Sequence, residues 1–234
     1  MSKEEQSTKL DIERIIFVGR TYEEYKEMFL LSEKELKGKK ILDCLGGACS
    51  FTAVGNQLGL DVTACDIAYY HASEDLKNKG LQDIEHAMES MEKAKENYKW
   101  DYFHTIEDLK KHRLSALHEC STHMKASSER YIPVTLPVLP FKNNAFDLVL
   151  SAHFLFTYGD RLDFPFHMET LKELLRVTKD EIRIFPLVDL EGKRYEHLEK
   201  IISYLTDHGY VAEEVIVPYE FQKNANSMLK ITKK

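Results

Sequence analysis

The sequence has little of what marks secreted, membrane-spanning or nucleic-acid-binding proteins. Its four cysteines form no obvious disulfide framework, and the polar stretch MSKEEQSTKLDIER at the start lacks the apolar core of a secretory signal. No run approaches the eighteen or so apolar residues of a membrane span. The formal net charge is −7, so the chain as a whole does not attract phosphate backbones. We therefore expect a cytoplasmic protein with reduced thiols and no membrane or nucleic-acid partner, and its oligomeric state stays open.

What the chain does have is a regular alternation of expected strands and helices. Apolar runs at 38–45 and 61–67 predict buried strands, and residues 50–59 between them predict a helix that ends near Gly59. Strand, helix and strand within about thirty residues make a βαβ unit, which implies a parallel sheet and a right-handed crossover. The 234 residues are enough for a single α/β domain, 1–234, with a well-filled core.

The same alternation resumes in the second half of the chain. Its last two expected strands are joined by the polar turn QKNAN without a helix, so they must pair antiparallel if they are neighbours. The expected strands of this half are 130–136, 145–152, 180–188, 210–221 and 227–234, and the expected helices are 167–178 and 195–209.

Two other regions are expected to be helical. Within residues 1–38, the sequences TYEE and SEKE both fit the capping box that starts a helix. Residues 71–129 interrupt the alternation: apolar residues from Leu81 to Met91 recur at steps of three and four, which predicts a long amphipathic helix, and 106–117 predicts a second. We interpret 71–129 as a helical insertion. It is either a lid over a binding site or a helical layer with no role in binding.

Between the first two expected strands lies the sequence ILDCLGGACSFT, which has the features of a nucleotide-binding turn. Gly46 and Gly47 have no Cβ, which suits a tight turn and a close approach of the backbone to a ligand. The helix that follows presents free N–H groups at its start, which suit an anion or a carboxylate. Asp66 lies about twenty residues further on, where an acid can accept hydrogen bonds from both ribose hydroxyls. A plain tight turn and a helix-capping acid are the simpler alternatives.

Four motifs together resemble the class I methyltransferases that use S-adenosylmethionine, most closely their small-molecule branch. ILDCLGG is similar to the first strand and glycine loop, with Asp43 as the in-strand acid, and DVTACDI is similar to the second strand with its terminal acid. LPFKNNAFDLVLSAHFLF resembles the stretch that runs into the fourth strand, and MLKITKK resembles the final antiparallel strand. The resemblance implies a Rossmann-like, doubly wound, mostly parallel seven-stranded sheet with an antiparallel last strand. It also implies S-adenosylmethionine contacts from Arg20, Tyr22, Asp43, Cys44, Leu45, Gly46, Gly47, Asp66, Ile67, Leu136, Ser151 and Ala152.

The function that follows is methyl transfer to a small-molecule acceptor. Because the sulfonium methyl is already activated, the site has to align a nucleophile in line with the carbon–sulfur bond and exclude water. His153, at the end of the expected fourth strand, is a candidate for orienting or deprotonating the substrate, with a packed wall residue as the alternative. The family usually has glycine where this chain has Leu45 and Cys49. That departure keeps open a non-catalytic protein that binds S-adenosylmethionine or a nucleotide and acts in regulation or interaction.

Three other functions fit the sequence less well. His112, His118, Cys120 and His123 lie close together, but their spacing matches no zinc finger, so no metal site is predicted. Enzymes that methylate exocyclic base amines usually carry an acid or Asn, two prolines and an aromatic residue after the fourth strand, where this chain has SAHF. The glycine spacing is also wrong for a dinucleotide dehydrogenase.

Overall fold

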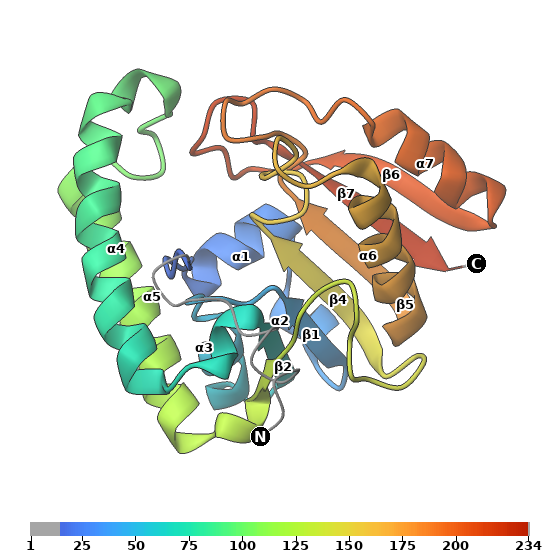
Figure 1. The fold of residues 1–234 in the computed structure, drawn as a ribbon, viewed down its shortest axis with the longest axis horizontal. Helices are drawn as coiled ribbons and strands as arrows, with labels where there is room; N and C mark the ends of the chain where they lie inside the picture. The colour runs from blue at the N-terminus through green and yellow to red at the C-terminus, as the bar shows by residue number, and fades with distance from the viewer. Residues whose placement is uncertain (1–14, 234) are drawn as a thin grey trace, which may run out of the picture.

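The computed structural model describes residues 15–233 and is built around one seven-stranded sheet (Figure 1). Its strand order is β3-β2-β1-β4-β5-β7-β6. Strands β1 to β5 pair in parallel, and β7 runs antiparallel to both of its neighbours. This confirms the doubly wound, mostly parallel sheet and the antiparallel last strand. The strands are β1 Lys40–Cys44, β2 Asp61–Asp66, β3 Tyr131–Pro133, β4 Phe146–Ala152, β5 Thr178–Phe185, β6 Tyr210–Ile216 and β7 Ser227–Lys233.

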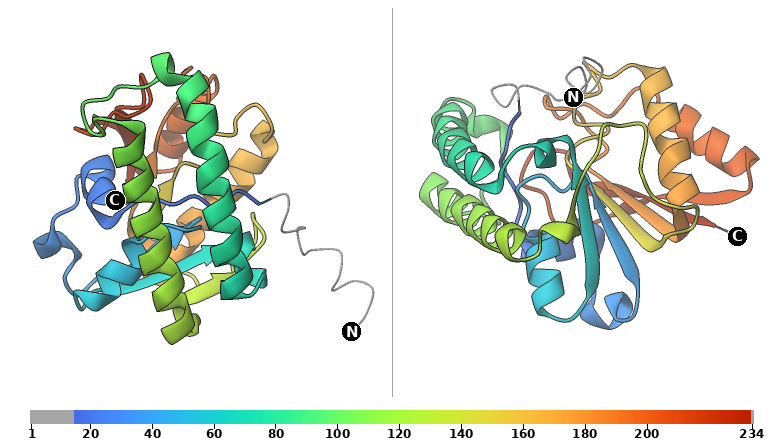
Figure 2. Two further views of the ribbon diagram at one scale, coloured as in Figure 1. Left: turned by 90° about the vertical axis from the view of Figure 1, so that its left-hand side faces the viewer. Right: turned by 60° about the horizontal axis from the view of Figure 1, so that its bottom comes forward.

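Helices cover both faces of the sheet because alternate strand residues point to opposite faces. In β1, Ile41 belongs to the core under α1, α3, α4 and α5, whereas Leu42 belongs to the core under α6 and α7. Figure 2 (right) shows the two groups of helices on either side of the sheet. The helices are α1 Tyr22–Phe29, α2 Glu33–Leu36, α3 Phe51–Gln57, α4 Ser73–Lys93, α5 Ile106–Ala126, α6 Phe164–Val177 and α7 Leu198–Asp207.

Helix α1 begins as the capping box predicts. Thr21 accepts a hydrogen bond from the amide of Glu24, whose carboxylate accepts one from the amide of Thr21. Helices α4 and α5 lie within 71–129 and pack side by side (Figure 2, left), which agrees with the helical expectation. No helix of residues 15–233 is long and apolar enough to cross a membrane. The N-terminal part of the 1–38 range, residues 1–14, lies outside the described residues.

Several predicted boundaries were wrong: the strand expected at 180–188 covers Thr178–Phe185, and the strand expected at 210–221 ends at Ile216. The second insertion helix continues to Ala126 instead of ending at Leu117, because Leu117, Cys120 and Met124 go on packing against the core. The third strand covers Tyr131–Pro133 and not 130–136. Pro133 has no N–H to donate to the ladder, and the chain then turns between Thr135 and Val138.

Candidate functional site

The residues predicted for a site lie mainly at the carboxyl ends of β1, β2 and β4, which are neighbours in the sheet. The chain runs from β1 outward to β2 and β3 and then returns to β4 on the other side of β1, so the strand order reverses between β1 and β4. Open α/β sheets bind ligands in the crevice at such a switch point. We call this region the carboxyl edge.

Both glycines of the loop after β1 occupy positions that other residues fit poorly. A Cβ on Gly46 would lie 2.8 Å from the Cβ of Ala64 and 2.9 Å from the hydroxyl of Tyr69. Gly47 has a φ of +50°. The N–H of Gly47 donates to Asp66 at 2.9 Å, and its carbonyl oxygen accepts from the Tyr69 hydroxyl at 2.9 Å. The loop is therefore held tightly against the end of β2.

Two buried carboxyl groups stand beside this loop. Asp43 accepts a hydrogen bond from the Tyr25 hydroxyl at 2.9 Å, and burial raises its pKa to about 7. Asp66, 8% exposed, accepts hydrogen bonds from the backbone N–H groups of Gly47 and Ala68 at 2.9 Å each. Burial raises the pKa of Asp66 to about 6, although these hydrogen bonds to the carboxylate oppose the rise. Both groups therefore titrate near neutral pH.

Residues 15–21, which we call the N-terminal strap, cross the glycine loop. The N–H of Arg20 donates to the Cys49 thiol at 3.2 Å, and the carbonyl of Arg20 accepts from the Ser50 amide at 2.9 Å. A Cβ on Gly19 would lie 2.0 Å from the carbonyl oxygen of Ala48, so only glycine allows this approach. The strap brings Arg20 to the loop, and Tyr22, the first residue of α1, follows with its N–H donating to the Ser50 hydroxyl, as the family resemblance implies. Sequence reasoning missed Gly19.

The end of β4 contributes Ser151, Ala152 and His153. The first two are buried, and His153 follows with a φ of +50°. The N–H of His153 donates to the carbonyl of Phe185 at 2.7 Å. Burial, with the charges of Arg20 and Arg113, lowers the pKa of His153 well below its ordinary value. The imidazole is therefore neutral at pH 7 and is a weaker base than an ordinary histidine.

The other predicted residues are less closely tied to the loop. Cys44 is fully buried at the end of β1, and Leu45 and Leu136 are half-buried and pack against the same hydrophobic cluster. Ile67 is half-buried and begins the short 3-10 helix Ile67–Tyr70. Leu136 follows the short β3 and does not belong to a strand, contrary to the prediction.

A buried ion pair that sequence reasoning missed lies behind the strap. The carboxylate of Glu24 in α1 accepts hydrogen bonds from Arg113 of α5 at 2.7 and 2.9 Å and from the Tyr219 hydroxyl at 2.8 Å. Burial alone would raise the pKa of Glu24, but Arg113 more than offsets it and the pKa is lowered. The pair joins α1, the insertion and the segment between β6 and β7.

The turn between α4 and α5, residues 94–105, is attached to the same C-terminal segment; we call it the tip loop. The amide of Lys99 donates to the carbonyl of Phe221 at 2.7 Å. The ring of Phe221 packs against Tyr98, Trp100 and Phe103, with centroids 4.8 to 5.3 Å apart. The insertion is thus attached at its tip as well as along its helices.

Several of the predicted site residues carry buried polar atoms without a hydrogen-bond partner. Seven buried side-chain nitrogen and oxygen atoms of residues 15–233 have no hydrogen-bond partner, and four of them belong to predicted site residues. These four are Nε of Arg20, the hydroxyl of Tyr22, Oδ2 of Asp43 and Nδ1 of His153. Because buried polar atoms are nearly always hydrogen-bonded, such a group indicates where a polar ligand binds.

The histidine and cysteine cluster of the insertion has other contacts. The thiol of Cys120 lies 3.7 Å from the carbonyl of Gly47, and Nδ1 of His123 lies 3.0 Å from the Tyr131 hydroxyl. Among residues 15–233, no three His, Cys, Asp or Glu side chains are placed to hold a metal ion.

One comparison places the chain in a protein family. Over 221 residues it is 35% identical to the uncharacterized protein MJ0045 of Methanocaldococcus jannaschii. The alignment covers 94% of this chain and 97% of that protein. The chain belongs to the MJ0045 family. No protein-family model matches it.

Two solved structures align with most or all of this chain. The 1,6-didemethyltoxoflavin-N1-methyltransferase of Burkholderia thailandensis, crystallised with 1,6-didemethyltoxoflavin and S-adenosylhomocysteine, aligns with a TM-score of 0.51 over 90% of this chain and 78% of its own, at 13% identity. The PH0226 protein of Pyrococcus horikoshii aligns over 100% of this chain and 99% of its own, with a TM-score of 0.47 at 15% identity. The toxoflavin enzyme confirms the class I methyltransferase fold.

Proposed function

We propose that the protein is an S-adenosylmethionine-dependent methyltransferase acting on a small-molecule acceptor. The observation that carries this proposal is the set of buried, unpartnered polar atoms of Arg20, Asp43 and His153, which belong to the strap over the glycine loop and to the ends of β1 and β4. The fold adds support, because the toxoflavin enzyme that shares it was crystallised with S-adenosylhomocysteine.

The charges of the edge fit the cofactor. The unpartnered oxygen of Asp43 is suited to a positively charged amine or sulfonium, which would also favour the ionised carboxylate. The unpartnered N–H at Nε of Arg20 is suited to a carboxylate at the methionine end. Asp66 already holds two amides, but each carboxylate oxygen has a further lone pair for a ribose hydroxyl.

The two departures from the family loop have structural uses. The Cys49 thiol accepts the N–H of Arg20, a contact that glycine would leave unmade, and burial raises the pKa of this thiol to about 11, so it stays protonated. Leu45 fills part of the hydrophobic cluster under α6 and α7. Cys49 thus adapts the loop to the strap, Leu45 adds to the core on the other face of the sheet, and both are compatible with a working site.

In the reaction, the chain's residues have to position and enclose the reactants. When bound, the cofactor supplies a methyl group already activated by its positive sulfur, and in-line displacement by the acceptor completes the transfer. The glycine loop and the ends of β1 and β4 would hold the methyl donor, while the strap and the insertion, a proposed lid, would exclude water. His153, neutral at pH 7, would use its unpartnered Nδ1 to hydrogen-bond a hydroxyl or amine of the acceptor molecule and so orient it toward the methyl group.

Turnover tests the proposal. The purified protein is incubated with S-adenosylmethionine and a panel of small hydroxyl, amine and carboxylate compounds, and S-adenosylhomocysteine and methylated product are measured by mass spectrometry. The proposal expects stoichiometric product with at least one acceptor, and a His153→Ala variant slower by about 10² or more at neutral pH. His123→Ala, a histidine of α5 outside the edge, is the matched control and should keep its rate.

A non-catalytic regulatory or interaction protein is the second candidate. It is favoured by the strap lying across the glycine loop and by Asp66 being occupied by two backbone amides. This candidate expects S-adenosylmethionine to bind without S-adenosylhomocysteine forming with any acceptor.

A further inference from the structure

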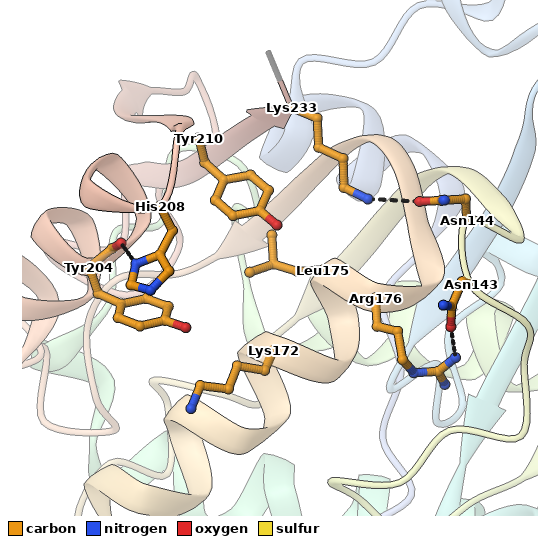
Figure 3. Close-up of a pocket in the computed structure, with 9 residues that line it drawn as sticks. All are labelled: Asn143, Asn144, Lys172, Leu175, Arg176, Tyr204, His208, Tyr210 and Lys233. Carbon is orange, nitrogen blue, oxygen red and sulfur yellow. Dashed lines mark hydrogen bonds between the residues drawn. The ribbon is translucent and has the colours of Figure 1, made fainter.

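A surface cavity lies at the opposite, amino end of the parallel strands. It encloses about 400 Å³ and is lined by the turn before β4, the ends of α6 and α7, and the strands β6 and β7 (Figure 3). None of its nine lining residues, all within 15–233, is acidic. They are Asn143, Asn144, Lys172, Leu175, Arg176, Tyr204, His208, Tyr210 and Lys233.

Three cations surround this cavity, and they differ in how far their charge is already satisfied. Arg176 is fully engaged: Glu173 lies 2.7 Å from it, and its other N–H groups donate to Asn143 and to backbone carbonyls. Lys233 donates to Asn144 at 2.9 Å and to the carbonyl of Thr178. These two donations leave the third N–H of its ammonium group available.

Lys172 is the cation with most capacity left. It is exposed, and within residues 15–233 its ammonium group lies 5.8 Å from the ring centroid of Tyr204 and makes no ion pair or hydrogen bond. In Figure 3, Leu175 and the hydroxyl of Tyr210 lie between Lys172 and Lys233, and Arg176 lies to the right of all of them. The positive groups are therefore spread around the cavity.

The acidic groups near the cavity are few. Glu173 is paired with Arg176, and Asp180 acts on Lys233 from a distance. One carbonyl at the end of each of α6 and α7 already accepts a hydrogen bond, Leu174 from the Thr178 hydroxyl and Tyr204 from the amide of His208. In a chain of net charge −7, a cavity with cations and no carboxylate in its lining is a local site of positive potential.

We infer that this cavity binds a small phosphorylated molecule with at least two negatively charged groups. Cations on opposite sides match separated charges better than a single orthophosphate. The Asn143 and Asn144 amides and the Tyr204 and Tyr210 hydroxyls supply neutral donors for further oxygens. The volume lies within the range of small-molecule sites. The cavity lies at the amino ends of the parallel strands, so it is separate from the carboxyl edge. The proposed phosphate site therefore does not depend on the proposed methyl transfer.

Pyrophosphate is the probe, titrated by calorimetry at low ionic strength into the whole protein, with orthophosphate titrated in parallel. We expect pyrophosphate to bind at least tenfold more tightly than orthophosphate. Lys172→Gln should weaken pyrophosphate binding about tenfold, because a charged donor is lost. Lys200→Gln is the matched control: Lys200 is also an exposed helix lysine 5.8 Å from an aromatic centroid, here Phe164, and lies outside the lining.

The outcomes are distinct. Pyrophosphate binding that falls in Lys172→Gln and stays within twofold of the parent in Lys200→Gln supports the site. No pyrophosphate binding, or equal losses in both variants, overturns it. Binding of S-adenosylmethionine should be unchanged in Lys172→Gln, so failure of either proposal is seen separately.

Discussion

The carboxylate of Asp66 accepts a hydrogen bond from the backbone N–H of Gly47 at 2.9 Å, which ties the end of β2 to the loop after β1. The contact requires Gly47 to adopt a φ of +50°, where a side chain is strained. Asp66 is 8% exposed and its pKa is raised to about 6, so the acid that holds the loop titrates just below neutral pH.

The two loop glycines should tolerate alanine differently. At Gly47 a Cβ meets only Asp66 Oδ2, at 3.7 Å, so Gly47→Ala should cost about 1 to 2 kcal/mol from its φ alone. At Gly46 the Cβ meets Ala64 and Tyr69 at under 3 Å, so Gly46→Ala should cost roughly 2 to 3 kcal/mol and distort the loop. Urea unfolding measures both. Gly59→Ala, with a φ of +81° and nothing within 4 Å, is the control for strain without collision. Equal losses of unfolding free energy in Gly46→Ala and Gly59→Ala would contradict the close packing of Gly46 against Ala64 and Tyr69.

Breaking the buried ion pair should be more costly than breaking a surface pair. Glu24→Gln or Arg113→Met leaves an uncompensated buried group, so each should lower the free energy of unfolding by about 3 to 5 kcal/mol. The double variant should recover part of that loss. Lys26→Ala, which breaks the exposed pair with Glu23, should cost less than about 1 kcal/mol. Additive losses in the double variant would show that the two side chains are not coupled.

How much of this could be read from the sequence depends on the distance between the residues involved. Local periodicity and capping residues predict the strands β1 and β2 and the start of α1. The Gly46 and Gly47 turn is visible for the same reason, since its conformation is set by neighbouring residues. Glu24 is predicted as a helix cap because Thr21 is three residues away. Its pairing with Arg113 is not predicted, because the two lie 89 residues apart and nothing local marks the contact.

The same limit applies to the strap and the tip loop. The need for glycine at position 19 follows from its contact with Ala48, and the role of Phe221 follows from its contact with Trp100. Neither contact can be predicted from the sequence, because the residues are far apart in it. The cation-lined cavity draws residues from five segments between Asn143 and Lys233, so no motif identifies it. Arg20 and Tyr22 were placed near the loop only by the family resemblance.

Stability should depend on pH through Asp43. Its pKa is raised in the folded state, so the folded protein keeps the proton that the unfolded chain releases near pH 4. Stability contributed by this group is therefore lost as the pH rises from about 4 to about 7, by up to roughly 4 kcal/mol. Asp43→Asn keeps an acceptor for Tyr25 and should gain stability relative to the parent at pH 8 but not at pH 4. Chemical denaturation at both pH values measures this, and a difference that is the same at both would contradict a raised pKa.

Removing the ring of Phe221 should release the tip loop. Phe221→Ala creates a cavity among Tyr98, Trp100 and Phe103, with a cost of about 3 to 5 kcal/mol for opening this region. Hydrogen exchange of the amides in 94–105 should become faster while that of β1 changes less. Ile216→Ala, 68% exposed at the end of β6, is the control and should leave exchange unchanged. Unchanged protection in Phe221→Ala would show that the α4–α5 packing alone holds the tip.

The central claim, that the carboxyl edge binds S-adenosylmethionine, is tested most directly by calorimetric titration of the parent, Asp66→Ala and Asp61→Ala. Asp61 begins the same strand at its opposite end, where it pairs with Arg130, and so controls for loss of a β2 carboxylate. The account predicts binding of S-adenosylmethionine and S-adenosylhomocysteine to the parent and to Asp61→Ala. In Asp66→Ala the affinity should fall at least about tenfold, since each lost hydrogen bond to a charged acceptor costs about 1.5 to 3 kcal/mol. No binding to the parent, or equal affinity in all three proteins, would contradict it.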